Sequence, residues 1–479
     1  MKNKENNKTK IVVALMLTMF LAAFEGTVVS TAMPTIARDL NGYKLISWVF
    51  SAYLLTSAVS TPIYGKLSDL LGRKKVLIVG VIIFLVGTLV SGLSQTMVQL
   101  IISRAIQGLG AGSIITLTYT IIGDLYDVSG SAKIQGLLST IWGVASILGP
   151  FIGGVILLKL TWHWIFFVNI PFGLLGIFMI SRYFHEEVHP QKIKIDYFGT
   201  LFLNISIVAL LFASLESSDK KYLVGCLILA IISFIIFIII EKKVEEPIIP
   251  FDIFNKISVF ANIISFLVAI LIIVIQSYMP LYTQNVLGYS PIISGLFLAP
   301  ISISWFTSSF ILAKFLKKFD AKYAIIISAI FVCVAVGLIV MLKISTSVIV
   351  LILAMFIIGF GFGGIMNSTI IISQISVSEE RKGVSTSTMN LIRTIGQTLG
   401  VSILGSILNT GITSHFNEKG ISNVTSNILG SAANPLHFTK LDIEKGFYSG
   451  LHLVFLSLLI LAILALLISI ISPKIKNHK

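Results

Sequence analysis

Between two long apolar runs of the sequence lies Gly65-Lys66-Leu67-Ser68-Asp69-Leu70-Leu71-Gly72-Arg73-Lys74, a short polar segment. Gly65 and Gly72 permit a tight turn and a close approach of helices. Asp69 and Arg73 are able to form charge-assisted hydrogen bonds with neighbouring helix ends in one conformation and to lose them in another. A contact of this kind biases an equilibrium between two conformations, so we expect these four residues to control a conformational change. The alternative is a basic loop that only anchors the chain.

The rest of the chain is unusually apolar. Of its 479 residues, 56% are hydrophobic and 12% are charged, and the mean hydropathy is +0.97. Soluble domains carry about 25% charged residues, roughly twice this share. The composition therefore indicates an integral membrane protein whose apolar surface faces lipid. The net charge of +14 lies in short segments between apolar runs, which indicates membrane orientation rather than a nucleic-acid partner.

Fourteen runs in the sequence have about the length that crosses a bilayer, roughly 20 residues. Their centres lie near residues 22, 56, 85, 109, 146, 175, 206, 231, 271, 301, 333, 360, 396 and 461. An even number of spans places both termini on one side of the membrane. With the N-terminus inside, the inner segments hold 24 lysines and arginines and the outer segments hold 9, while Arg104 and Arg393 lie inside spans. We therefore expect both termini to be cytoplasmic.

Two parts of the sequence share a glycine spacing. Intervals of thirteen and then four residues separate Gly136, Gly149 and Gly153, and also Gly383, Gly396 and Gly400. Transporters are often built from two related halves around a central site. We therefore predict an all-α membrane fold of two six-helix bundles with a pseudo-twofold relation, plus two extra spans. The predicted units are a first bundle over residues 1–184, two inserted spans with cytoplasmic loops over 185–256, and a second bundle over 257–479.

Ionisable residues within predicted spans are costly in lipid and are therefore functional candidates. Glu25 and Arg104 lie at similar depths below the outer ends of the first and fourth spans. Burial raises the pKa of a carboxyl and a nearby arginine lowers it, so the two effects oppose each other. We expect Glu25 to bind a proton and a cationic substrate alternately, with Arg104 tuning it. The alternative is a static ion pair.

Arg393 in the thirteenth span has no obvious acidic partner within a span. It is a candidate to bind an anionic or polar group of a substrate, or alternatively it bonds to carbonyls near a kink. Gln276 and Asn390 are uncharged polar residues within spans and are further candidates to contact substrate. Most polar residues of this kind bond between helices, which contributes about 0.6 kcal/mol each.

Several segments resemble the major facilitator superfamily and, within it, the drug:proton antiporters with fourteen spans. The segment from Gly65 to Lys74 resembles the loop signature of the superfamily. Glu25–Val29 followed by Ala32–Pro34 resembles the first-span motif of the branch, with Glu25 where Asp is usual. Arg104–Ala111 resembles the motif linked to proton coupling. The signatures of the fourteen-span branch are matched by Trp162–Pro171 and Met279–Gln284.

The fifth predicted span resembles the antiporter motif of the same family. The matching residues after Gly136 are Ala145, where Gly is usual, Gly149, Pro150, Gly153 and Gly154. Pro150 removes a helix hydrogen bond and favours a kink. The small side chains allow a neighbouring helix to pack closely. We expect a tight interface here that seals one side of the protein against leak.

The resemblance implies a proton-coupled multidrug efflux pump of a bacterial plasma membrane. It implies export of lipophilic, often cationic, drugs or dyes by alternating access, by a monomer surrounded by lipid. The alternative is an exporter of an endogenous metabolite, lipid or peptide that transports drugs incidentally. An enzyme or a sensor is disfavoured, because no cluster of His, Asp or Glu lies in the predicted spans.

We expect no cofactor, no metal and no nucleic acid to bind. Gly359, Gly361 and Gly364 match the dinucleotide fingerprint but lie within an apolar span without a preceding strand. Cys226 and Cys333 lie within apolar runs, which disfavours a disulfide or a zinc site.

Overall fold

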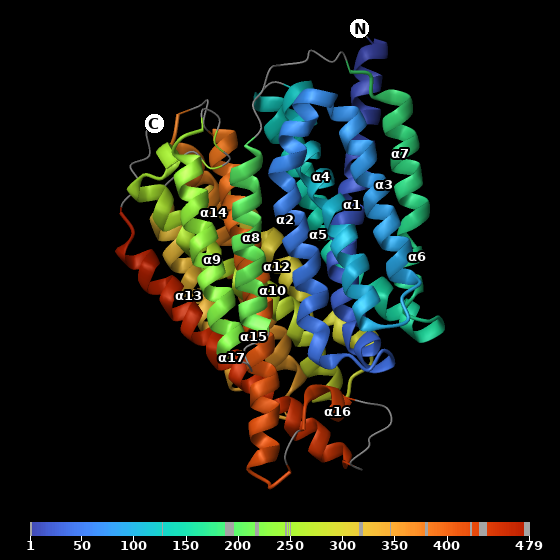
Figure 1. Cartoon of the computed structure of the whole chain (residues 1–479), viewed down its shortest axis with the longest axis vertical. Coiled ribbons are helices and arrows are strands. Elements are labelled where there is room, and N and C mark those ends of the chain that lie inside the picture. The colour runs from blue at the N-terminus through green and yellow to red at the C-terminus, as the bar shows by residue number, and fades with distance from the viewer. Residues whose placement is uncertain are drawn as a thin grey trace.

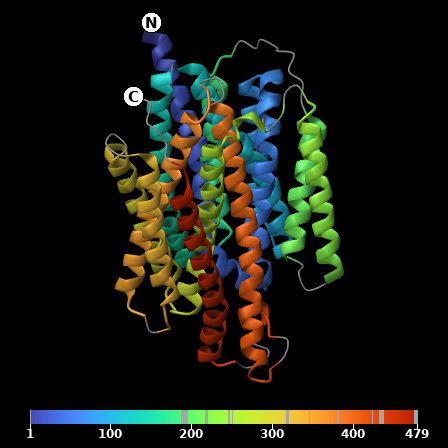
Figure 2. The same ribbon diagram turned by 90° about the vertical axis from the view of Figure 1, so that its left-hand side faces the viewer.

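The computed structural model of the chain is an array of long helices that run side by side (Figure 1). It describes residues 2–126, 128–186, 196–215, 220–244, 247, 249, 251–315, 320–344, 346–378, 382–421, 424–430 and 438–473. Two views show that the chain begins and ends at the same end of the array (Figures 1 and 2). We call the opposite end, where the first long helix turns into the second, the η1 end.

The first part of the chain contains α1 (Lys2–Asp39), η1 (Tyr43–Leu45), α2 (Ile46–Leu71), α3 (Arg73–Gly92), α4 (Met97–Leu125), α5 (Val128–Lys159), α6 (Trp164–Phe167) and α7 (Asn169–Tyr183). The middle contains α8 (Tyr197–Leu215), α9 (Lys220–Glu241) and η2 (Phe251–Ile253). The last part contains α10 (Lys256–Asn285), α11 (Pro291–Leu296), α12 (Ala299–Phe315), α13 (Ala321–Val340), α14 (Val348–Ile375), α15 (Lys382–Asn417), α16 (Ser426–Gly430) and α17 (Lys440–Ile471).

Twelve helical segments in the described part of the chain are long and apolar enough to cross a membrane. They lie in α1, α3, α4, α5, α6–α7, α9, α10, α11–α12, α13, α14, α15 and α17. The all-helical membrane fold is therefore as expected, but the expected count of fourteen spans is not reached. Two further long helices are not among these segments: α2, with 26 residues, and α8, with 19 residues, of which Phe198–Leu210 is an apolar stretch in the described part of the chain.

The local sequence determines where several helices begin. Thr96 accepts a hydrogen bond from the backbone N–H of Gln99 and so caps α4, and Asn255 caps α10 in the same way. Thr439 and Asp442 form a reciprocal capping box at the start of α17. Gly72 adopts φ = 92° between α2 and α3, a backbone conformation that favours glycine. The tight turn expected at this position is therefore present.

The helices differ widely in how much of their apolar surface is enclosed by protein. The most apolar window of α1 is 67% buried, whereas that of α9 is 17% buried. A helix that is apolar on all sides and exposed on most of them is adapted to lipid. The α8–α9 pair packs on the rest of the protein through a small cluster, made of Ala58, Leu203, Ile207, Phe237 and Leu391. The α8–α9 pair therefore lies at the periphery, while α1 lies at the centre.

Candidate functional site

Two opposite charges lie at the centre of the first half of the chain. Glu25 of α1 is 0% exposed and Arg104 of α4 is 1% exposed. Arg104 Nη1 donates a hydrogen bond to Glu25 Oε1 at 3.1 Å. Removing two charges from water costs free energy, and hydrogen bonds to their remaining polar atoms offset part of it. Arg104 Nε is enclosed without a hydrogen-bond partner among the described residues.

Neutral polar side chains surround the ion pair. Asn169 Nδ2 donates to Glu25 Oε2 at 2.5 Å, so both carboxylate oxygens are occupied. Arg104 Nη1 also donates to Gln107 Oε1, and Gln107 Nε2 donates to Thr88 Oγ1 at 2.8 Å. The Arg104 guanidinium lies 4.1 Å from the ring centroid of Tyr53, a cation–π contact. These contacts link α1, α2, α3, α4 and α7 through one buried network.

Sequence reasoning missed the roles of Asn169, Gln107, Thr88 and Tyr53. Asn169 lies where one apolar span is broken, directly after the short helix α6 and at the start of α7. A polar residue at such a break, two positions before Pro171, was a usable signal. Gln107 follows Arg104 by three positions and so lies on the same helix face. Thr88 and Tyr53 carried no comparable signal in the sequence.

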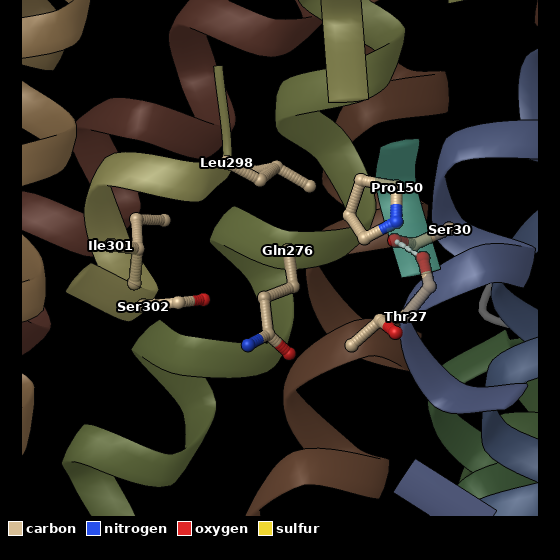
Figure 3. Close-up of a pocket in the computed structure, with 7 residues that line it drawn as sticks. All are labelled: Thr27, Ser30, Pro150, Gln276, Leu298, Ile301 and Ser302. Atoms are coloured by element: carbon tan, nitrogen blue, oxygen red, sulfur yellow. Dashed lines mark hydrogen bonds between the residues drawn. The ribbon is translucent and has the colours of Figure 1, made fainter. Parts of the chain in front are cut away.

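A small cavity lies between α1, α5, α10 and the start of α12 (Figure 3). Its volume is about 20 Å³, and its wall consists of Thr27, Ser30, Pro150, Gln276, Leu298, Ile301 and Ser302. Figure 3 shows the Gln276 amide between Ser302 and Thr27. The cavity has room for about one water molecule, and drug-sized ligands need at least roughly 300 Å³. In this conformation the space beside Gln276 is therefore closed to such ligands.

The predicted antiporter motif packs on two helices at once. A methyl group at Gly149 would lie 2.1 Å from Thr27 Oγ1 of α1, and Thr27 Oγ1 donates to the Ala145 carbonyl at 3.1 Å. On the other side, a methyl group at Gly154 would lie 2.4 Å from Ile292 Cα of α11. The absent side chains thus allow α5 to touch both α1 and α11. Pro150 itself is buried, and its carbonyl faces Gly295 of α11.

The two copies of the glycine spacing make matching contacts. A methyl group at Gly153 would lie 2.8 Å from Val28 of α1. In the second copy, methyl groups at Gly396 and Gly400 would lie 2.8 Å from the Phe266 carbonyl and 2.7 Å from Ile270 Cγ2, both on α10. The relation of α5 to α1 therefore resembles the relation of α15 to α10. The proposed division into two bundles itself stays a prediction.

Several hydrogen bonds join the first and last parts of the chain at the η1 end. Ser47 and Tyr278 hydroxyls lie 2.9 Å apart, and Ser51 and Ser402 hydroxyls lie 2.7 Å apart. Gln284 Nε2 donates to the Thr31 carbonyl at 3.0 Å. These contacts hold the η1 end closed.

Tyr43 adds a further seal at the η1 end. Its hydroxyl donates to the Pro34 carbonyl at 3.1 Å and to Asn285 Oδ1 at 3.3 Å. Burial raises the pKa of Tyr43 to about 12, so the hydroxyl keeps its proton and remains a donor at neutral pH. Gly430 packs flat on the Tyr43 ring, because a methyl group there would lie 2.2 Å from the ring carbon Cε2.

The polar segment between α2 and α3 lies at the opposite end of the array (Figure 1). Arg73 Nε donates to Asp124 Oδ2 at 3.1 Å, and Arg73 Nη1 donates to Ser68 Oγ at 2.9 Å. Glu186 accepts from the backbone N–H groups of Arg73 at 2.8 Å and of Lys74 at 2.9 Å. A carboxylate is stabilising at a helix N-terminus such as that of α3. Sequence reasoning missed Glu186.

The structure gives few contacts for the other two residues of this segment, Gly65 and Asp69. Gly65 is in loose contact, since a methyl group there would lie 4.0 Å from Thr116 Cγ2. Asp69 belongs to α2, but its side chain lies outside the side chains that the structure describes.

The other predicted substrate contacts lie apart from the ion pair. Arg393 of α15 donates from Nε to Ser265 Oγ at 2.6 Å, and from Nη2 to the Met366 carbonyl and to Thr369 Oγ1, both at 2.9 Å. In the described part of the chain it contacts no carboxylate. Asn390 is exposed on the surface of α15.

Comparison with known proteins identifies the family. Residues 15–401 match the model of the Major Facilitator Superfamily. The chain is 35% identical over 422 residues to Multidrug resistance protein 3 of Bacillus subtilis (strain 168), covering 87% of this chain and 82% of that protein. It is 33% identical over 399 residues to Multidrug efflux pump SdrM of Staphylococcus aureus (strain N315), covering 82% and 88%.

Solved structures show the same fold. An auto-inhibited peptide transporter of the POT family aligns with a TM-score of 0.70 at 14% identity, covering 98% of each chain. A bacterial homologue of the human lysosomal transporter Spinster, in an inward-facing conformation, aligns with a TM-score of 0.67 at 15% identity, covering 97% of each chain. The chain therefore belongs to the Major Facilitator Superfamily, a family of multi-span membrane transporters rather than enzymes.

Proposed function

We propose that the chain is a proton-coupled multidrug efflux transporter of a bacterial plasma membrane. The names of the relatives support the substrate class, since Multidrug resistance protein 3 and Multidrug efflux pump SdrM are both multidrug transporters. We assign it to the fourteen-span drug:proton antiporters, with α2 and α8 as the second and seventh spans in addition to the twelve segments above. Both termini would then be cytoplasmic, the η1 end would face outward, and the protein would act as a monomer in lipid.

The enclosed Glu25–Arg104 pair is the observation that carries this proposal. Glu25 has no exposed surface, and its two oxygens are held by Arg104 and Asn169. A proton on Glu25 removes the charge that attracts Arg104, and a cationic substrate competes for the same carboxylate. Proton and cation therefore exclude each other at one residue. Mutual exclusion at a single site is what antiport requires.

Alternating access supplies the second half of the mechanism. The hydrogen bonds of the η1 end, together with Gly149, Pro150, Gly153 and Gly154, seal one side in this conformation. Opening that side has to break these contacts, and a differential stabilisation of the two states decides which is populated. We assign the opposing control to Gly65, Asp69, Gly72 and Arg73 at the other end. Two bundles, residues 1–184 and 257–479, would rock around the centre, with 185–256 as an insertion.

Substrate contacts in the open cavity are assigned to Glu25, Gln276, Asn390 and Arg393. Gln276 lines the closed cavity, whereas Glu25 lies two positions before Thr27 on α1 and so on another face of that helix. A rocking motion that separates α5 from α11 would enlarge this space. Lipophilic, often cationic compounds are the class that a greasy cavity with one carboxylate favours.

The test uses purified protein in liposomes with an imposed pH gradient and a fluorescent lipophilic cation. Wild type should move the dye when the gradient is applied, and Glu25→Gln should abolish this movement. Glu418→Gln is the matched control, because Glu418 is exposed on the protein surface, and it should transport as wild type does. Proton-driven movement by Glu25→Gln at the wild-type rate would contradict the role of Glu25. If wild type moves no dye while a metabolite or another ion gradient drives flux, the drug-efflux assignment is wrong.

A further inference from the structure

Arg393 is a cation on a set of helices that carries no carboxylate. The sequence from Lys256 to Asn417, which holds α10 to α15, contains three acidic residues, Asp320, Glu379 and Glu380. Asp320 precedes α13, and Glu379 and Glu380 lie outside the residues that the structure describes. By contrast, the buried Arg104 has Glu25 at 3.1 Å. A membrane-embedded charge without a partner is costly, so such residues occur where they have a function.

The hydrogen bonds of Arg393 leave part of its guanidinium free for a ligand. An arginine has five N–H donors. Nε and Nη2 use theirs on two hydroxyls and one backbone carbonyl, all of them uncharged acceptors. Nη1 forms no hydrogen bond with any residue that the structure describes, and it is not among the enclosed polar atoms that lack a partner. Its two N–H groups therefore remain free to bind a ligand, and no carboxylate in the described part of the chain pairs with the guanidinium.

An apolar hollow lies between α10 and α15, and its wall includes a chain neighbour of Arg393. It measures about 250 Å³ and is lined by Phe254, Val259, Asn262, Ile263, Phe266 and Ile392. Ile392 is the chain neighbour of Arg393, and Phe266 is the chain neighbour of its partner Ser265. Asn262 is the single polar residue of the wall, and its Oδ1 is enclosed without a hydrogen-bond partner, while its Nδ2 donates to the Ser258 carbonyl at 2.9 Å. Enclosed polar atoms without a partner are rare in native proteins.

We propose that Arg393 binds the anionic group of an amphipathic organic acid, whose apolar part lies in this hollow. The inference rests on the proposed function and deepens it, because it names a class of substrate group, the carboxylate, in addition to the cation. The physical reason is that a guanidinium forms strong charge-assisted hydrogen bonds with carboxylates in a low-dielectric site. A free inorganic anion offers the same charge but has no apolar part.

The test measures binding to the full-length protein in lipid nanodiscs by calorimetry. The probe is 4-phenylbutyrate, and 4-phenylbutyramide is the uncharged comparison. Wild type should bind the carboxylate about tenfold more tightly than the amide, as expected for a hydrogen bond to a charged group. Arg393→Gln should remove this preference, and Arg393→Lys should keep part of it. The matched control is Arg182→Gln at an exposed position of α7, which should bind as wild type does.

A second variant keeps the test decisive if Arg393→Gln does not fold. Ser265→Asp places a carboxylate beside the guanidinium, which supplies the missing negative charge from the protein itself. This variant should fold and lose the preference for the carboxylate. Equal binding of 4-phenylbutyrate to wild type and to a folded Ser265→Asp or Arg393→Gln variant overturns the proposal.

A competition experiment with chloride distinguishes an organic acid from an inorganic anion as the ligand of Arg393. Two results together would show that the site binds an inorganic anion instead of an amphipathic acid. Millimolar chloride would displace 4-phenylbutyrate, and 4-phenylbutyrate would bind no more tightly than acetate. This binding is measured without a proton gradient and should persist in Glu25→Gln. Failure of proton-driven dye movement would therefore contradict the proposed function but not the binding of an organic acid by Arg393.

Discussion

Arg104 and Arg393 occupy membrane-spanning helices in the two parts of the chain, but their surroundings differ. Arg104 is enclosed with a carboxylate, an amide oxygen and an aromatic ring. Arg393 is held by two hydroxyls and a carbonyl, and keeps one nitrogen accessible. The first arginine pairs with a carboxylate of the protein. On our proposals the second would pair with an anionic group of a solute, so that the two together would suit solutes of either sign.

The largest effect that tests this difference is expected for Arg104→Met. The substitution leaves Glu25 enclosed without its partner charge, which should lower the free energy of unfolding by about 3–5 kcal/mol. Denaturant unfolding in detergent micelles measures this change. The double variant Glu25→Gln/Arg104→Met should recover most of the loss. An unchanged stability of Arg104→Met would remove the distinction between the two arginines.

A smaller loss is expected for Asn169→Leu. Asn169 donates to Glu25 Oε2 at 2.5 Å, and a hydrogen bond to a charged group contributes about 1.5–3 kcal/mol. Unfolding measurements should show a loss in this range, and proton-driven dye movement should slow. Asn417→Leu, at an exposed position of α15, is the control and should stay within about 0.5 kcal/mol of wild type. Equal stability of the two variants would show that Asn169 does not hold the carboxylate.

The packing of α5 against α1 is tested by Gly149→Ala. The added methyl group would lie 2.1 Å from Thr27 Oγ1, and overpacking of this kind costs about 1–3 kcal/mol. Because the strain falls on the closed conformation, passive dye leak through liposomes should increase. Gly143→Ala on the same helix has nothing within 4 Å and should neither leak nor lose stability. If Gly149→Ala leaks no more dye than wild type, this interface does not form the seal.

The smallest effect is expected for Arg393→Met. Thr369 Oγ1 also donates to the Ile365 carbonyl at 2.8 Å and lies 3.2 Å from Ser265 Oγ, so both hydroxyls keep partners. No carboxylate is left behind, and stability should change by no more than about 1 kcal/mol. Denaturant unfolding without any added organic acid gives the number. A loss as large as that of Arg104→Met would mean that Arg393 neutralises a charge that the described residues do not include.

The fold could be predicted from the sequence wherever hydropathy alone marks a helix that crosses the membrane. Runs of apolar residues near 20 positions long located most of the spans, because a bilayer imposes that length. The breaks before Asn169 and between α11 and α12 were missed, since hydropathy does not register a change in helix direction. Of the fourteen expected spans, α2 and α8 are not among the twelve found in the described residues, although α2 has 26 residues and α8 has 19.

The candidate site was predictable only in part. Glu25 and Arg104 stood out because charges are rare within spans, and counting from the span ends gave compatible depths. Their neutral partners did not stand out, because the position of an amide or a hydroxyl in space depends on how helices pack. Glu186 was missed for another reason. It lies among the charged residues that follow α7, where its role at the start of α3 has no local sign.

The peripheral position of α9 has a consequence for how the protein responds to its surroundings. Its 22 residues extend over about 33 Å, slightly more than the hydrocarbon thickness of a typical bilayer, roughly 30 Å. Because most of its surface is not enclosed by protein, we expect α9 to tilt or kink, or to thicken the bilayer locally, when the bilayer becomes thinner. Phe237 of α9 packs in one cluster with Ala58 of α2 and Leu391 of α15, so that tilt is passed to helices of both parts. We therefore expect membrane thickness to influence how readily the transporter changes conformation.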